Sequence, residues 1–263
     1  MVRSHLTWSG VLDDRWAATM LRPRWVLLDR VLRWPVVAGL GRNRTFAWLA
    51  ARTRFFDDAV TSALDAGIDQ VVIVGAGYDS RAWRLARDGV RFFEVDHPAT
   101  QADKRGRAPE GGPTYVPVEL GVDALGDALP AAGHRGDRPS VFVVEGVTMY
   151  LTEPQVRDLL GTVRRLGGPG GSRVAVNFGL GVEAGSRASA AIHRLALAVG
   201  GERITFRPSL EQAEAAVAAA GWVPDRTTTA PELIRRYLAG TGLPLTGVRP
   251  TAFAMTAATA TTG

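Results

Sequence analysis

Hydrophobic positions between Val11 and Asp65 recur with the period of a helix. The pattern is clearest at the end of this segment, where core-type positions follow one another at spacings of three and four: Phe46, Leu49, Thr53, Phe56, Val60 and Leu64. Such spacing places the side chains on one face of an α-helix. We therefore expect residues 1–66 to form a helical cap in front of a sheet.

From residue 67 onward, short apolar runs alternate with segments of helical length. The expected strands are Gln70–Val74, Val90–Val95, Thr114–Val118, Ser140–Val144 and Arg173–Phe178. The expected helices between them are Ser80–Arg87, Ala99–Arg105, Val122–Leu129 and Glu153–Leu166. Most of the runs are apolar nearly throughout, which is typical of parallel strands that helices cover on both faces. The alternation predicts an α/β fold with a Rossmann-like, doubly wound and mostly parallel sheet.

The last part of the chain departs from this alternation. Helical patterns occur at about Gly185–Val199, Ser209–Ala220 and Pro231–Leu238, and Trp222–Thr228 lies between the last two. The stretch Arg249–Thr259 predicts a last strand, antiparallel to the others. No internal repeat is visible, so we expect a single domain.

Composition places the chain among globular proteins. Of its 263 residues, 46% are hydrophobic and 22% are charged, which is enough to bury a sizeable core. The formal net charge is +5, yet arginines alternate with acidic residues, and the densest basic stretch, Lys104–Arg107, is four residues long. Nucleic-acid binding needs clustered basic residues, so we do not expect it.

Other chemistries are excluded by what the sequence lacks. It has no cysteine, which rules out disulfides, thiolate nucleophiles and cysteine-ligated metals. No pair of histidines has the spacing of a metal-ligand motif, so no metal is expected; they are His5, His97, His134 and His193. Met1–Asp14 lacks the apolar core of a signal peptide, and no apolar run approaches the roughly 18 residues of a membrane span. These observations predict a cytoplasmic protein.

The segment Val71–Arg81, VVIVGAGYDSR, is the strongest local motif. An apolar strand runs into Gly75-Ala76-Gly77, where the backbone can approach a ligand, and a helix N-terminus follows. Ser80 takes the place of the third glycine in the dinucleotide motif, and Asp79 stands where a phosphate would sit and would repel it. The motif therefore favours a cationic or zwitterionic ligand. A glycine turn that serves packing alone is the alternative.

Acidic residues end several of the predicted strands. Glu94 and Asp96 close the second strand, Glu119 the third and Glu145 the fourth. Asp96 lies about 20 residues past the glycines, where such folds place the acid that binds ribose hydroxyls, although it could instead cap the helix that starts near Pro98. Ligands of open α/β sheets bind at the carboxyl ends of the strands. A ligand with an ammonium, a sulfonium, a ribose and an adenine could use all of these acids, which points to S-adenosylmethionine.

The chain also resembles the leucine carboxyl methyltransferase family, including its bacterial members that act on polyketides and other natural products. The resemblance covers roughly residues 45–225, and it rests on five motifs. They are Arg52–Asp58 (RTRFFDD), Val74–Arg84 (VGAGYDSRAWR), Phe93–Lys104 (FEVDHPATQADK), Glu145–Leu151 (EGVTMYL) and Gly221-Trp222. The resemblance implies a class I S-adenosylmethionine-dependent methyltransferase, with a helical cap (1–66), a cofactor-binding core (67–178) and an acceptor pocket with the last strands (179–263).

The resemblance also implies roles for individual residues. Arg54 would hold the methionine carboxylate, and Gly75 and Gly77 would pass under the methionine moiety, with Ala76 and Asp79 also at the cofactor. Asp96 would bind the ribose, and Glu119 with Leu120 would lie at the adenine. Glu145 would lie near the ammonium, and Tyr150 would flank the reacting centre. The family has a further basic residue near its N-terminus, for which Arg15, Arg22 and Arg24 all compete. The segment Phe178–Arg207, where this fold commonly builds its acceptor pocket, shows no motif from which residue roles can be carried over.

The expected reaction is methyl transfer to an oxygen of a small-molecule acceptor. A carboxylate is already ionised at pH 7, whereas a phenol usually needs a base, and the sequence offers only His193 and Tyr150 as catalytic candidates. Four arginines beside the presumed pocket could clamp a carboxylate, of which Arg203 and Arg207 are expected to bind the substrate; the others are Arg187 and Arg194. Open alternatives are a phenol or hydroxyl acceptor, an NAD-dependent dehydrogenase and a non-catalytic regulator. Nothing indicates the oligomeric state.

Overall fold

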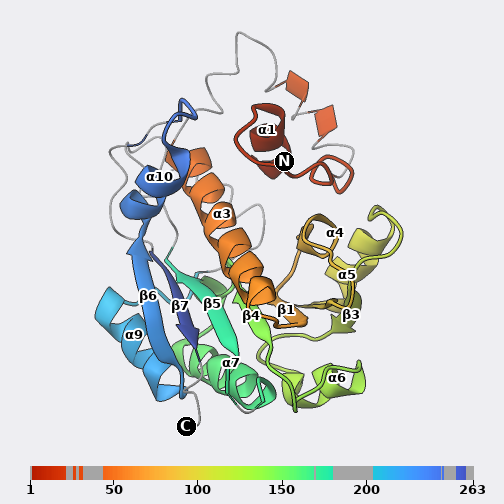
Figure 1. Cartoon of the computed structure of the whole chain (residues 1–263), viewed down its shortest axis with the longest axis vertical. Helices are drawn as coiled ribbons and strands as arrows, with labels where there is room; N and C mark the ends of the chain where they lie inside the picture. Colours follow the sequence, from red (N-terminus) through yellow and green to blue (C-terminus); the bar gives the residue numbers. More distant parts are fainter. Residues whose placement is uncertain are drawn as a thin grey trace.

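The computed structural model of the protein describes residues 2–21, 26–27, 30–31, 44–168, 170–179, 204–243, 245 and 253–258. Figure 1 shows the arrangement of its elements. The helices are α1 (Val2–Trp8), α3 (Arg44–Asp65), α4 (Arg81–Arg84), α5 (Pro98–Arg105), α6 (Leu125–Ala131), the 3-10 turn η2 (Thr148–Tyr150), α7 (Glu153–Leu166), α9 (Leu210–Ala219) and α10 (Ala230–Leu238). The strands are β1 (Gln70–Val74), β2 (Arg91–Asp96), β3 (Thr114–Pro117), β4 (Val141–Val144), β5 (Arg173–Phe178), β6 (Val223–Thr229) and β7 (Phe253–Ala258).

All seven strands form one sheet, in the order β3-β2-β1-β4-β5-β7-β6. The first five pair in parallel, with β1 between β2 and β4. Strand β7 is antiparallel to both of its neighbours, β5 and β6. The prediction of a Rossmann-like, mostly parallel sheet with an antiparallel last strand is confirmed.

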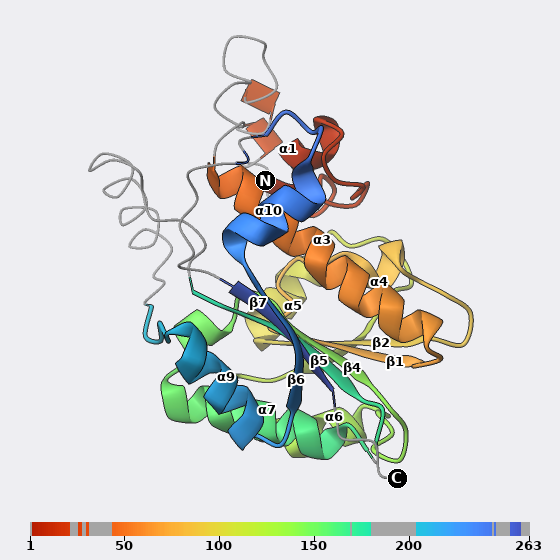
Figure 2. The same cartoon turned by 60° about the vertical axis from the view of Figure 1, so that its left-hand side comes forward.

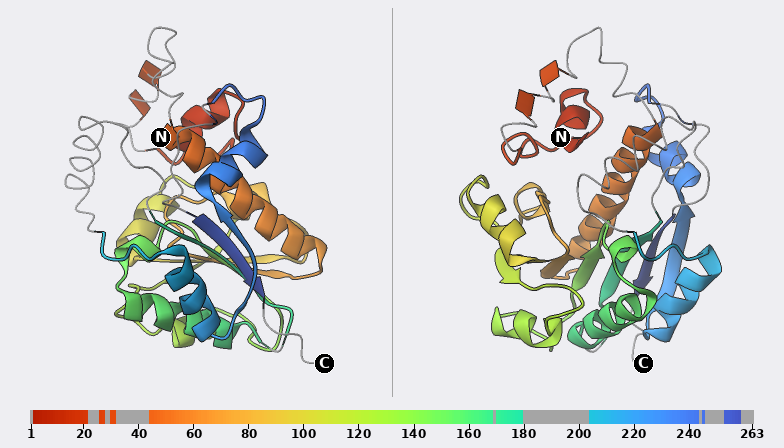
Figure 3. Two further views of the ribbon diagram at one scale, coloured as in Figure 1. Left: turned by 90° about the vertical axis from the view of Figure 1, so that its left-hand side faces the viewer. Right: turned by 180° about the vertical axis from the view of Figure 1, so that it is seen from behind.

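Helices cover the two faces of this sheet and bury separate cores. Figure 2 shows α3 and α10 on one face and α6, α7 and α9 on the other, and the left view of Figure 3 shows the same layers edge-on. Successive residues of a strand point to opposite faces. Val71 and Ile73 of β1 accordingly join the core under α3 and α10, whereas Val72 and Val74 join the core under α7. This division explains why the central strands are apolar at most positions.

Sequence patterns place most elements to within two residues. The bounds of β1, β5 and α7 are as expected, because each is a clear apolar run or a capped amphipathic helix. Helix α4 is shorter than the predicted Ser80–Arg87: it ends at Arg84, after which Leu85 donates its backbone N–H to Arg81. Residues 11–21 form turns and not the expected helix. The predicted helix Gly185–Val199 lies outside the described residues.

His134, which follows α6, is buried against aromatic side chains of β2 and β4. Its Nε2 is 2.9 Å from Ser140 Oγ, and its ring packs between Phe93 and Phe142. Burial, with a smaller contribution from Arg91, lowers the pKa of His134 to about 4. An unfolded histidine has a pKa of about 6.5, so between these values the unfolded chain binds the extra proton and the folded state is disfavoured.

We therefore expect the free energy of unfolding to fall as the pH drops from about 6.5 towards 4. Urea unfolding at several pH values would measure this for the wild type and for His134→Gln, which removes the titrating ring. The difference between the two curves cancels the contributions of all other groups. If the two proteins lost stability in parallel, His134 would not be responsible.

Candidate functional site

The loop after β1 carries the glycines that the sequence singles out. Gly75 and Gly77 have positive φ angles, 64° and 50°, which glycine adopts without a steric penalty. A Cβ at Gly75 would lie 2.3 Å from Val147, so only glycine lets the loop pack against the segment that follows β4. At Gly77, by contrast, no atom of the described residues lies within 4 Å of that position. The loop is therefore fixed on one side and open on the other.

Asp96 joins this loop to the end of β2. Its Oδ2 accepts a hydrogen bond from Gly77 N at 2.5 Å, and its Oδ1 accepts one from His97 N at 2.7 Å. A carboxylate has about four acceptor positions, so two remain for a ligand. Helix α5 is capped by the His97 side chain, which accepts from Ala99 N. The alternative that Asp96 caps this helix is therefore wrong.

An ion-pair network fills the space between the glycine loop, α3 and the N-terminal residues. We call it the arginine–carboxylate network, and it contains equal numbers of positive and negative side chains. Its members are Arg3, Arg52, Arg81, Arg84, Asp14, Asp57, Asp79 and Glu145.

Arg81 is the centre of this network. Its side chain is 0% exposed and binds three carboxylates, with N–O distances of 2.6 Å to Asp57, 2.5 Å to Asp79 and 2.7 Å to Glu145. Burial raises the pKa of each carboxyl group, but Arg81 together with the neighbouring cations outweighs it and holds the pKa of all three below the usual range. The carboxylates in turn raise the pKa of Arg81 despite its burial. All four groups are therefore charged at neutral pH.

This pairing changes the interpretation of two predicted site residues. Asp79 is only 5% exposed and uses both oxygens on Arg81, accepting from its backbone N and its Nη1. Its charge is compensated, so it does not act as the free anion that the sequence suggests. Glu145 is likewise shared between Arg81 and Arg52. Its side chain is at the strand end as expected, but in an ion pair.

Arg52 and Arg54 point in different directions from helix α3. Two residues along a helix correspond to a rotation of about 200°, so both cannot reach one site. Arg52 Nε is 2.9 Å from Glu145 Oε1, and its guanidinium lies 3.6 Å from the position of a Cβ on Gly146. Arg54 instead donates to the carbonyl oxygens of Val11, at 2.5 Å, and Tyr237. The structure therefore brings Arg52, and not the expected Arg54, to the end of β4.

Among the described residues, Arg3 is the basic residue that joins the network from the N-terminal helix. Its Nη1 is 3.7 Å from Asp79 Oδ2 and its Nε is 3.2 Å from Asp14. Sequence reasoning considered Arg15, Arg22 and Arg24 instead; Arg15 stacks on Trp16, and the other two lie outside the described residues. No motif marks Arg3, because its partners come from distant parts of the chain.

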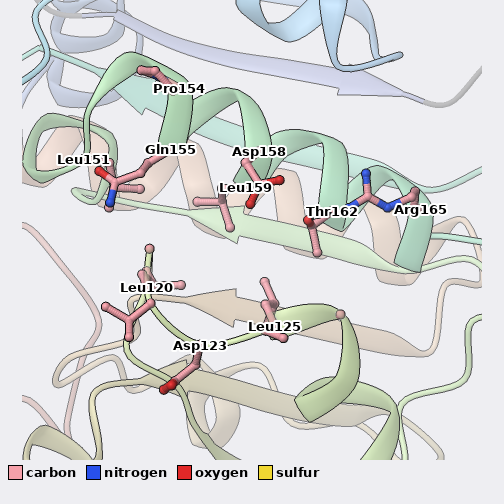
Figure 4. Close-up of a pocket in the computed structure, with 14 residues that line it drawn as sticks. Leu120, Asp123, Leu125, Leu151, Pro154, Gln155, Asp158, Leu159, Thr162 and Arg165 are labelled. Carbon is pink, nitrogen blue, oxygen red and sulfur yellow. Dashed lines mark hydrogen bonds between the residues drawn. The ribbon is translucent and has the colours of Figure 1, made fainter.

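The residues expected at the adenine lie beside a pocket. Leu120 lines a cavity of about 500 Å³ between the segment after β3 and helix α7. Figure 4 shows Leu120, Asp123 and Leu125 on one side, facing Leu159 and other residues of α7. Glu119 is half exposed, and its carboxylate is 3.9 Å from His97 Nε2. The contact of Glu119 and Leu120 with the adenine stays a prediction, and the cavity that Leu120 lines is open space next to them.

Tyr150 is held in place by the segment that begins at residue 204. Thr205 donates from its backbone N to Met149 O at 2.8 Å and from its hydroxyl to Leu151 O at 2.7 Å. These bonds fix the chain on both sides of Tyr150, whose side chain is 39% exposed. Arg207 is exposed two residues further on. The other acceptor-site candidates, His193 and Arg203 with Arg187 and Arg194, lie outside the described residues.

No helix among the described residues is long and apolar enough to span a bilayer. Within the same ranges, no three His, Asp or Glu side chains are grouped in a way that could hold a metal ion.

Solved structures share this architecture. A DUF574 family protein from Streptomyces avermitilis superimposes with a TM-score of 0.57 at 19% identity, covering 98% of this chain and 97% of that one. An S-adenosylmethionine-dependent methyltransferase from Mesorhizobium loti gives a TM-score of 0.51 at 15% identity over 76% of this chain and 97% of that one. The fold is therefore that of the Rossmann-like methyltransferases.

Sequence comparison identifies the family within this class. The leucine carboxyl methyltransferase model matches residues 3–164. A relative in Mycolicibacterium paratuberculosis is 32% identical over 94% of this chain and 86% of its own length. One in Parafrankia is 41% identical over 52% of this chain, and the match spans about half of that relative, 46%. Both are named "Putative S-adenosyl-L-methionine-dependent methyltransferase". The chain belongs to the leucine carboxyl methyltransferase family.

Proposed function

We propose that this protein is an S-adenosylmethionine-dependent O-methyltransferase that methylates a carboxylate of a small molecule, such as a natural-product intermediate. The observation that carries the proposal is the meeting of three features at one edge of the sheet: the open side of Gly77, the unused acceptor positions of Asp96, and the guanidinium of Arg52. The open side of Gly77 leaves room for the cofactor beside the loop backbone. Asp96 matches the ribose of the cofactor, and Arg52 matches its carboxylate. We expect the protein to act in the cytoplasm.

The residues present fit the cofactor in a defined order. Asp96 would accept hydrogen bonds from the ribose, Leu120 with Glu119 would border the adenine, and Arg52 would bind the methionine carboxylate. Glu145 would accept hydrogen bonds from the ammonium at the acceptor positions that Arg52 and Arg81 do not use. When bound, S-adenosylmethionine supplies an activated methyl group on its sulfonium. The chain's own contribution is to hold donor and acceptor in line and in contact, which is the main requirement of such a displacement.

Asp96 should be required for tight cofactor binding. We expect Asp96→Ala to weaken binding of S-adenosylhomocysteine by about 1 to 3 kcal/mol, because the ribose hydroxyls lose their acceptor and Gly77 N loses its partner. Isothermal titration calorimetry would measure this. Asp137→Ala is a control, since Asp137 is an exposed carboxylate that pairs with Arg135 before β4, away from this edge of the sheet. Equal affinity in Asp96→Ala and the wild type would remove Asp96 from the ribose role.

The acceptor class should be visible in the pH dependence of the rate. A carboxylate acceptor stays ionised between about pH 6 and 9, so its methylation rate should be nearly constant in that range. We expect Arg207→Ala to raise KM more than it lowers kcat, as for a group that binds the ground state and the transition state equally. Small carboxylic acids and phenols would be compared as acceptors. A rate that rises tenfold per pH unit, with a large loss of kcat in His193→Ala, would instead indicate a hydroxyl acceptor and a base.

A further inference from the structure

The sequence contains a single lysine, Lys104, and its side chain is buried. It lies on α5, and only 1% of its surface is exposed. The other basic residues of this kind in the chain are thirty arginines. Its ammonium donates to the backbone oxygen of Asp79 at 2.6 Å and to Glu94 Oε2 at 2.5 Å. It also lies 5.4 Å from the centre of the Trp83 ring. The ammonium therefore has specific partners on β2, on the glycine loop and on α4.

A buried ion pair of this kind is a weak source of stability. Removing two charges from water costs about as much as their attraction returns, and apolar replacements of similar size are often neutral or stabilising. Glu94, also 1% exposed, shows this cost, because burial raises its pKa to about 7 in spite of Lys104. The contact that an apolar pair could not replace is the hydrogen bond to Asp79 O.

That hydrogen bond holds the far end of the glycine loop. The near end is attached to β2 through its own backbone, since Gly75 N and Ala76 N donate to Val95 O at 2.8 and 3.1 Å. Gly77 N is held by Asp96, as described above. Asp79 closes the loop, and Lys104 is the group that connects its carbonyl to α5. The two ends of the loop are thus fixed by different parts of the molecule.

We propose that Lys104 is a positioning residue for the cofactor: its ammonium fixes the Asp79 end of the glycine loop so that the loop backbone faces the methionine moiety. Glu94 serves as the counter-ion of this buried ammonium. The inference rests on the proposed cofactor site. It assigns to Lys104 no contact with the cofactor itself.

Three variants separate positioning from stability. Lys104→Met leaves Glu94 buried without a partner and should lower both stability and affinity for S-adenosylhomocysteine. The double variant Lys104→Met with Glu94→Gln removes both charges, so urea unfolding should show that most of the stability returns. Its affinity should remain about tenfold or more below that of the wild type, the effect expected for one lost charge-assisted hydrogen bond. Arg105→Met is the matched control, because Arg105 is the next residue of α5 and is exposed over Tyr115; its affinity should be unchanged.

A spectroscopic measurement tests the connection directly. Protein labelled with ¹⁵N at the lysine Nζ has one such signal by nuclear magnetic resonance, that of Lys104. This signal should shift when S-adenosylhomocysteine is added, because the loop that Lys104 holds contacts the ligand. Full recovery of affinity in the double variant, or a lysine signal that is unmoved at saturating ligand, would overturn the inference. A wild-type protein that binds no S-adenosylhomocysteine would instead refute the proposed function.

Discussion

Replacing Arg81 by methionine should lower the free energy of unfolding by about 3 to 5 kcal/mol, the cost of leaving buried charges without their partner. Arg81 is fully buried and binds Asp57, Asp79 and Glu145 at once. Methionine fills much of the space but compensates none of these charges. Urea unfolding at pH 7 would measure the loss. Arg84→Met is the matched control, since Arg84 has one short ion pair, with Asp57 at 2.9 Å, and a longer one of 3.8 Å with Asp14, and its loss should cost clearly less.

The same variant should change the response to acid. In the wild type the three carboxyl groups have lowered pKa values. Their contribution to the free energy of unfolding is therefore present above the pKa of the unfolded groups, about 4. It is lost as the pH falls through the pKa values of the folded state. Without Arg81, burial is no longer outweighed and their pKa values rise. The stability difference between wild type and Arg81→Met should therefore narrow between pH 7 and 5. A constant difference would show that the three carboxylates do not depend on Arg81.

Arg52→Gln should weaken S-adenosylhomocysteine binding by about 10- to 100-fold, through loss of a charge-assisted contact to the methionine carboxylate. Arg54→Gln should leave this affinity nearly unchanged and lower the stability instead, because Arg54 joins α3 to the backbone at Val11 and Tyr237. The two variants make the same chemical change two residues apart on one helix. Calorimetry and urea unfolding on both proteins would compare the effects.

A ligand without a carboxylate sharpens this comparison. Methylthioadenosine contains the adenosine part of the cofactor but no amino-acid group. Its affinity should be the same for the wild type and for Arg52→Gln. An equal loss for both ligands would mean that Arg52 acts on the shape of the site and does not bind the carboxylate.

The sequence predicts the sheet well because its signals are local. Each central strand is a nearly continuous apolar run. Helix α7 follows Thr152, the N-cap residue of a capping box that can be recognised in the sequence. Helix α4 was predicted too long, because the residues after Arg84 are compatible with a helix and only the contacts of Arg81 and Arg84 mark its end. Local patterns therefore give the existence of an element more reliably than its limits.

The candidate site was predictable only in part. Patterns locate Gly75, Gly77 and Asp96, since a strand end and a glycine turn define their places. They do not show that Asp79 and Glu145 share Arg81, because Glu145 lies 64 positions from Arg81 in the chain. The choice between Arg52 and Arg54 depends on which face of α3 meets β4, and Lys104 looks like an ordinary surface residue in a polar helix. Tertiary contacts decide all three.

The position of β7 in the sheet has a consequence for how the protein folds during its synthesis. Strand β6 leaves the ribosome before β7, yet it reaches the sheet only through β7, which lies between it and β5. Domains fold from the N-terminus as they emerge. The five parallel strands can therefore assemble before β6 and α9 have joined them. A nascent chain stalled before Phe253 would therefore expose the edge of β5 and leave β6 without its neighbour in the sheet, and β7 would be the last strand to join, between β5 and β6.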